Sequence, residues 1–365
     1  MKKSFFAILA IAACFASCSK MVDHSVEVNQ MITFDNYVGK DATTKAAVVA
    51  DVASVNVNAY LHKVGATTPF QSNFMKDQAV TKVTSEGSAS WTYSPAKFWP
   101  AADQQVDFVA WVPVNNATVS HATLDFTVPT EVKNQTDLLV AVPQLNQNRA
   151  GDNSPVSLTF KHLLSRIGFE IIATGIPSDD VNKVELVEVS LNGTFANYGK
   201  VDMTCATNPE GVTGPFIKAA AVPEKPVEGA PTAATTNQYK LTGTHFGWTD
   251  NRITNATKDE EDKLVGVSNT ADSYIMLIPD TNAPTHITVT YTVTTTNGEG
   301  VDPTVITNTA NFALQPATGT FAYEAGKAYK YVFTITMESI TFDVVEETWS
   351  TETVGNIVDN YTPAE

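Results

Sequence analysis

The stretch VEVNQMITFD, residues 26–35, decides the fold class. Its apolar side chains, Val26, Val28, Ile32 and Phe34, fall on one face when every second residue is compared, and polar side chains fall on the other. A period of two residues is typical of a half-buried β-strand. The stretch therefore predicts a first strand that lays one face on a hydrophobic core.

The same period recurs along the rest of the chain. After residue 20, no segment holds an apolar period of 3.6 residues long enough to predict an amphipathic helix. Short turns with Pro, Asn and Gly separate most of the candidate strands, as in β-sandwiches. These strands are expected at 52–61, 79–83, 89–93, 106–112, 124–128, 138–142, 156–160, 167–173, 184–191, 274–278, 287–294, 311–314, 329–336 and 340–345. The sequence predicts an all-β protein.

A polar segment, NQNRAGDNSP at 146–155, divides the chain into two parts. With 365 residues, the protein is long enough for two domains of ordinary size. We expect two tandem β-sandwich domains, at 18–150 and 151–365, with the first strand at about 24–36. The Pro-rich run at 221–231 and the polar run at 249–263 are interpreted as surface insertions.

The leader, residues 1–17, has the pattern of an export signal. Two lysines precede an uncharged apolar run at 5–16, which is shorter than the roughly 20 residues of a spanning helix. Small residues precede Cys18, which predicts lipoprotein processing with a lipid on that cysteine. Cys14 is a rival site, but Cys18 is favoured because a polar tether follows it. A plain secretory signal is the alternative.

Charge and cysteine content exclude several classes of protein. The formal net charge of −16 argues against a nucleic-acid partner and against a polybasic membrane-binding surface. Two of the three cysteines lie in or next to the leader, so a disulfide scaffold is excluded.

The sequence contains no recognisable catalytic set. H-E-x-x-H, G-x-S-x-G, Walker A and G-x-G-x-x-G motifs are all missing, and the six histidines show no metal-ligand spacing. Cys205 is interpreted as an inert thiol, His162 as a structural residue and the acidic run at 259–262 as a solvated loop. We expect a protein without metal, cofactor or enzymatic activity.

Five tryptophans raise the alternative of a glycan-binding surface lipoprotein, because sugars stack on exposed indoles. Trp91, Trp99, Trp111 and Trp349 lie in or beside apolar strand patterns, which favours packing in a core. Trp248 lies near polar insertions and is ambiguous. A cell-surface hydrolase is a third hypothesis, which no motif supports.

Several segments in a fixed order resemble the fimbrillin family, the subunits of type V pili. They are the lipobox SCSK at 17–20, ITFDNYVGKDATTKA at 32–46, FWPAADQQVDFVAWVP at 98–113, LTFKHLLSRIGFEI at 158–171 and GKAYKYVFTITMESITFDVVEETW at 326–349. Each motif is weak alone, whereas their order along nearly the whole mature chain is fairly specific.

The resemblance implies two transthyretin-like β-sandwiches and an outer-membrane lipoprotein anchored through Cys18. It also implies an adhesive cell-surface fimbria built with other fimbrillin subunits. In that family a trypsin-like or Arg/Lys-specific protease cuts the loop after the first strand, and a strand of a neighbour fills the groove. Lys45, with Lys40 as a second site, stands where arginine is commoner.

The segment after Trp349, STETVGNIVDNYTPAE, is the expected donor strand. It carries only Val354, Ile357 and Val358 as apolar anchors. Because a donor strand with so few apolar residues is weak, the protein could be a tip or accessory subunit instead of a shaft subunit.

Overall fold

The protein is all-β, and its described elements are strands and one short 3₁₀ turn, η1 (Val132–Asn134). The computed structural model describes residues 30–38, 52–66, 70, 72–85, 88–112, 114–148, 154–175, 181–193, 195–205, 217–219, 237–242, 252–253, 257–258, 264–265, 274–279, 284–314, 323–336, 340–348 and 358–359. Within these ranges no helix is long and apolar enough to span a membrane.

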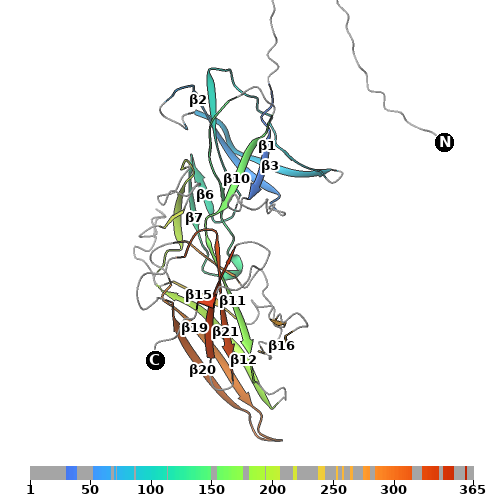
Figure 1. Ribbon diagram of the computed structural model, residues 1–365, viewed down its shortest axis with the longest axis vertical. Coiled ribbons are helices and arrows are strands. Elements are labelled where there is room, and N and C mark those ends of the chain that lie inside the picture. The colour runs from blue at the N-terminus through green and yellow to red at the C-terminus, as the bar shows by residue number, and fades with distance from the viewer. Residues whose placement is uncertain are drawn as a thin grey trace, which may run out of the picture.

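The largest sheet has eight strands and lies in the upper part of Figure 1. Its order is β1-β10-β8-β5-β2-β3-β4, with β9 paired to β5. The strands are β1 (Phe34–Val38), β2 (Ser54–Lys63), β3 (Ser72–Ser85), β4 (Ser88–Thr92), β5 (Gln104–Trp111), β8 (Leu139–Ala141), β9 (Gln144–Gln147) and β10 (Val156–His162).

Two further sheets run along the lower part of the molecule (Figure 1). One has the order β18-β11-β21-β22-β23 and the other β15-β12-β19-β20. Their strands are β11 (Ser165–Ala173), β12 (Asn182–Gly193), β15 (Asn237–Leu241), β18 (Tyr274–Leu277), β19 (His286–Thr295), β20 (Thr304–Ala313), β21 (Lys327–Ile335), β22 (Ile340–Thr348) and β23 (Val358–Asp359).

A smaller sheet, β14-β13-β7-β6, lies between these regions, and β16 pairs with β17. Its strands are β6 (Ala117–Ser120), β7 (Thr123–Thr127), β13 (Tyr198–Asp202) and β14 (Ile217–Ala219), while β16 is Thr257–Lys258 and β17 is Leu264–Val265. Because β7 precedes residue 150 and β13 follows it, this sheet joins both halves of the chain.

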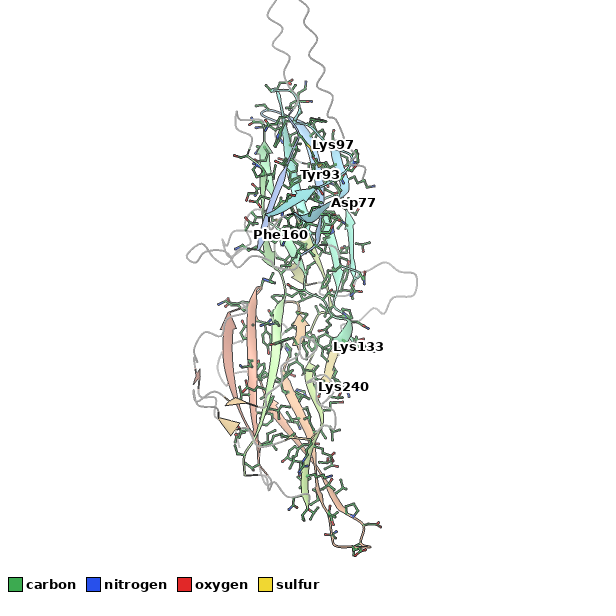
Figure 2. All side chains as sticks on the ribbon, turned by 90° about the vertical axis from the view of Figure 1, so that its right-hand side faces the viewer. Asp77, Tyr93, Lys97, Lys133, Phe160 and Lys240 are labelled. Carbon is green, nitrogen blue, oxygen red and sulfur yellow. The ribbon has the colours of Figure 1, made fainter. Side chains whose placement is uncertain are left out.

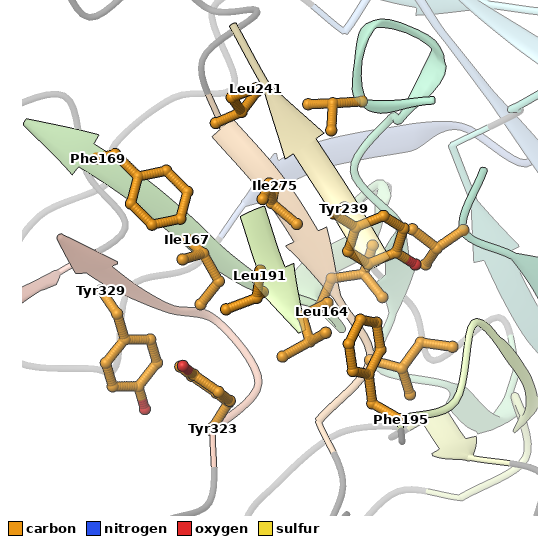
Figure 3. Close-up of a cluster of buried hydrophobic side chains, with 14 of the residues drawn as sticks. Leu164, Ile167, Phe169, Leu191, Phe195, Tyr239, Leu241, Ile275, Tyr323 and Tyr329 are labelled. Atoms are coloured by element: carbon orange, nitrogen blue, oxygen red, sulfur yellow. The ribbon is translucent and has the colours of Figure 1, made fainter. Parts of the chain in front are cut away.

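Alternating side chains build two hydrophobic cores. In β19 the inward residues Ile287, Val289, Tyr291 and Val293 are buried, and the residues between them are half-buried. The larger core collects such faces from both lower sheets (Figure 3). The smaller core belongs to the eight-stranded sheet.

The chain crosses from the eight-stranded sheet to the lower sheets at two consecutive buried leucines. The Leu163 amide donates to Leu138 O (3.0 Å), whereas Leu164 O accepts from the Gly326 amide (2.9 Å). Residues 156–162, expected in the second domain, therefore lie as β10 in the eight-stranded sheet. The larger core also contains residues from both sides of position 150. The division at 150 stays a prediction.

Candidate functional site: the seat of the first strand

Strand β1 lies at the open end of the eight-stranded sheet, where β10 is its one neighbour in the sheet order. The pairing is parallel and runs from Phe34↔Val156 to Val38↔Phe160. At its start, the Val156 amide donates to Thr33 O at 2.8 Å. Parallel pairing of segments so far apart in sequence depends on the tertiary fold rather than on a hairpin.

The residues just before β1 are held by a second segment, residues 97–99. The Ile32 amide donates to Lys97 O, and the Trp99 amide donates to Gln30 O, both at 2.9 Å. Met31 forms an antiparallel bridge with Phe98. Residues 30–38 therefore lie against β10 and against 97–99, and these two segments form the walls of what we call the first-strand seat.

Two apolar side chains of the first strand close the smaller core. Ile32 is fully buried and Phe34 is nearly so, whereas Thr33 and Asp35 between and after them are exposed. The Phe34 ring lies 5.5 Å from the Tyr93 ring and packs edge-on against Phe108 at 5.7 Å. Burial of each such side chain stabilises the fold by about 1.5–3 kcal/mol.

A tyrosine hydroxyl holds the first strand by its main chain. The Tyr93 hydroxyl donates to Ile32 O at 2.8 Å and accepts from the Lys97 amide at 3.3 Å. Burial raises the pKa of this hydroxyl, and its hydrogen bond with the Lys97 backbone partly offsets that rise. The hydroxyl therefore stays protonated and remains a donor at neutral pH. Figure 2 places Tyr93 and Lys97 close together in the upper part of the molecule.

The predicted alternation of the first strand is confirmed for residues 32–35. The first strand, expected at 26–34, differs from the observed strand in two ways. Residues 30–32 pair with the loop at 97–99, and the regular strand β1 continues to Val38. Val26 and Val28 lie outside the described residues.

The predicted site residues also fall outside the described ranges. These are Cys18 with its rival Cys14, and Lys45 with its second site Lys40. The sequence does not predict the role of Tyr93. The sequence offers no local signal for it, since its partner Ile32 is 61 residues away.

Cys205 and His162, the two reactive side chains singled out in the sequence, both lie in the described part of the chain. Burial, together with the Asp202 carboxylate, raises the pKa of the Cys205 thiol and so disfavours the nucleophilic thiolate. His162 Nδ1 contacts Asp137 Oδ2 just before the crossing between sheets. Across the described part of the chain, no three His, Cys, Asp or Glu side chains gather as a metal site.

Three tryptophans in or beside the eight-stranded sheet pack against the hydrophobic cores, as expected. Trp111 is buried, while Trp91 and Trp99 are partly buried against the smaller core. Trp248 and Trp349 lie outside the described side chains.

This geometry defines a class of all-β proteins in which the first strand lies at a sheet edge and covers a hydrophobic core. The chain belongs to the fimbrillin-like family, whose model matches residues 44–349. No curated protein matches the chain.

Solved structures of fimbrial and adhesion proteins are similar to the chain. A fimbrial protein from Bacteroides vulgatus ATCC 8482 has 19% identity and a TM-score of 0.58, covering 88% of this chain and 100% of that one. A protein assigned to cell adhesion, from Bacteroides uniformis ATCC 8492, has 17% identity and a TM-score of 0.48, covering 88% and 98%. The tip fimbrial protein Mfa3 from Porphyromonas gingivalis has 11% identity and a TM-score of 0.35, covering 82% and 94%. The first of these matches supports a shared fold.

Proposed function

We propose that this protein is a structural subunit of a cell-surface fimbria that serves adhesion, and that its first strand is exchanged for a strand of another subunit. Membership of the fimbrillin-like family supports the first part. The observation that carries the second part is the position of β1, which lies at a sheet edge while Ile32 and Phe34 fill the core.

Loss of the first strand would uncover two kinds of unsatisfied surface. The backbone groups of β10 and of residues 97–99 that now bind the strand would lose their partners. The cavity vacated by Ile32 and Phe34 would expose the Phe108 and Tyr93 rings. An incoming strand with apolar residues at alternate positions would satisfy both, which is the logic of strand addition to a sheet edge.

Such a strand must run parallel to β10, as β1 does. It must also place an aliphatic and an aromatic-sized side chain two residues apart. The Tyr93 hydroxyl would bind its backbone whatever the side chain at that position, so it adds affinity without selecting a sequence.

We assign the trigger to cleavage after Lys45, with Lys40 as the second site, by a trypsin-like or Arg/Lys-specific protease. The loop at 39–47 is rich in small and polar residues, which favours cleavage without unfolding of a core. We further propose that the protein is not an enzyme and that a lipid on Cys18 anchors the precursor in the outer membrane.

The test compares protease-treated wild type with a Lys40→Ala/Lys45→Ala variant. A matched control, Lys63→Ala/Lys76→Ala, removes two exposed lysines of β2 and β3 instead. Wild type and control should form ladders on denaturing gels without boiling, and N-terminal sequencing should find the cut after Lys45 or Lys40. The Lys40/Lys45 variant should form no ladder. Equal polymer yields from all three proteins would refute the proposed trigger.

A further inference from the structure

Strand β20 is an unusually long sheet edge. It has ten residues and pairs with β19 over ten consecutive positions, from His286↔Ala313 to Thr295↔Thr304, without a bulge. It stands at the end of the order β15-β12-β19-β20. Among the described strands at sheet ends, the next longest are β1, β4 and β15, with five residues each.

This edge lacks the usual features that prevent pairing with other chains. Natural edges are protected by shortness, charged residues, proline or bulges. The sequence of β20, TVITNTANFA, has no charge and no proline. Its first four residues are exposed, with Val305 at 57% and Ile306 at 55%. About half of the backbone groups of an antiparallel edge strand point away from its neighbour and need another partner.

The strand that pairs with β20 also lacks acidic and basic residues other than histidine. The adjacent β19, HITVTYTVTT, has no Asp, Glu, Lys or Arg, and its one histidine, His286, stands at its start. The acidic residues nearest to them in the sequence, Glu299 and Asp302, lie in the connection between the two strands. In a chain with a net charge of −16, most surfaces of two copies repel each other, so an uncharged edge is where two copies can approach.

We propose that β20 is a homotypic contact, in which it pairs antiparallel with β20 of a second copy of this chain. An antiparallel pair of identical strands is symmetric, so one patch serves both subunits around a two-fold axis. The pair joins two four-stranded sheets into one and satisfies the outward backbone groups of both edges.

The side chains fix the register of this contact. Ile306 and Phe312 lie opposite the buried Val293 and Ile287, and are therefore on the same face of the sheet as the core, where Phe312 is buried and Ile306 is exposed. Thr309 and Asn311 lie on the other face, where they contact the Thr290 and Thr288 hydroxyls.

A two-fold axis through Thr309 brings exposed Ile306 opposite Phe312 of the second copy. The same axis sets Thr307 opposite Asn311 of the second copy on the outer face. Among the pairs that this axis sets within β20, only Asn308 with Ala310 joins a polar to an apolar side chain.

The contact is separate from the first-strand seat. The seat belongs to the eight-stranded sheet in the upper part of Figure 1, and β20 belongs to a lower sheet. Pairing through β20 thus needs neither cleavage nor strand exchange, and it can join subunits of neighbouring fimbriae side by side.

Cross-linking tests the register on uncleaved protein in which Cys14, Cys18 and Cys205 are serine. Thr309→Cys places the thiols of two copies directly opposite each other, within reach of a disulfide. The control Thr292→Cys lies on the outer face of β19, opposite Thr307 and one strand further in, which is too far. Mild oxidation should give at least about tenfold more covalent dimer with Thr309→Cys. Equal yields would overturn the proposal.

Sedimentation tests the contact itself. Thr309→Lys brings two like charges together at the axis and should raise the dissociation constant of the dimer at least about tenfold. Thr292→Lys should associate as wild type does, and circular dichroism should show both variants folded. A wild type that stays monomeric, or a Thr309→Lys variant that dimerises equally well, would overturn the proposal. Polymerisation after cleavage is expected to survive Thr309→Lys, so the two proposals fail independently.

Discussion

At the scale of single residues, the first strand is held by one side chain that recognises its backbone. The Tyr93 hydroxyl binds Ile32 O, a carbonyl that any replacement strand would also present. The Phe34 ring, in contrast, needs the space between Tyr93 and Phe108. Tyr93 therefore adds affinity for any strand in this position, and the apolar cavity determines which side chains the strand must carry.

Tyr93→Phe should reduce the binding free energy of the first strand by about 1 kcal/mol, the usual net contribution of a hydrogen bond. After cleavage, release of the strand should accelerate roughly fivefold, because that energy corresponds to such a factor. Mass spectrometry of the released peptide gives the rate. Tyr291→Phe, a buried tyrosine of the larger core, is the control. An unchanged release rate for Tyr93→Phe would contradict the assigned role.

At the scale of elements, a buried carboxylate in β5 binds the main chain of strand β9 and of the bend at Phe70. Asp107 is fully buried, and its oxygens accept from the Phe70 amide (3.2 Å) and the Asn146 amide (2.7 Å). Both donors have positive φ, a conformation that is uncommon for residues with a side chain. His62 Nε2 lies 3.2 Å from the same carboxylate and completes its surroundings.

Asp107→Asn should destabilise the protein by about 3 kcal/mol, since it replaces one acceptor with a donor that faces a backbone N–H or His62. Urea unfolding at neutral pH measures the change. Asp103→Asn, an exposed residue in the turn before the same strand, should leave the midpoint unchanged. If both variants unfold at the same urea concentration, Asp107 does not stabilise the positions of β9 and of the bend at Phe70.

The sequence predicts a strand well where one face of the strand is buried and the other is exposed to solvent. The alternation in β19 is regular, and it was predicted at 287–294. β20 was expected only at 311–314, because its first residues are exposed on both faces and leave no period. In β3, expected only at 79–83, the pairing with β2 shifts register, and Asp77 has positive φ. The seat could not be predicted, since the parallel pairing of β1 with β10 is set by the tertiary fold.

At the scale of the whole molecule, the sequence predicts attachment to a membrane at one end. Cys18→Ala should abolish labelling of the protein with a fatty-acid analogue and release it from the membrane fraction, because the thioether to the lipid would be lost. Cys205→Ala, which leaves the leader intact, should be labelled like wild type. Labelling that persists in Cys18→Ala and disappears in Cys14→Ala would move the lipid to the rival site.

The two halves of the chain are coupled through shared sheets and a shared core. β10 lies between β1 and β8 in the sheet order, although it follows residue 150. Val156, Leu158 and Phe160 are buried in the smaller core. A fragment that ends at residue 150 would keep the first strand and lose its neighbour, together with three core side chains.

The fragment 18–150 should therefore lack a cooperative unfolding transition, whereas 18–164, which includes β10 and the buried Leu163, should have one. Loss of three buried side chains removes roughly 5–9 kcal/mol of burial energy, which is comparable to the stability of a small domain. The longer fragment should still be less stable than the whole chain, because Leu124 and Phe126 of β7 lose their β13 neighbours. Urea titrations followed by near-ultraviolet circular dichroism compare the three proteins. A sharp transition in 18–150 would support the predicted boundary at 150 and show that β10 is dispensable to the first sheet.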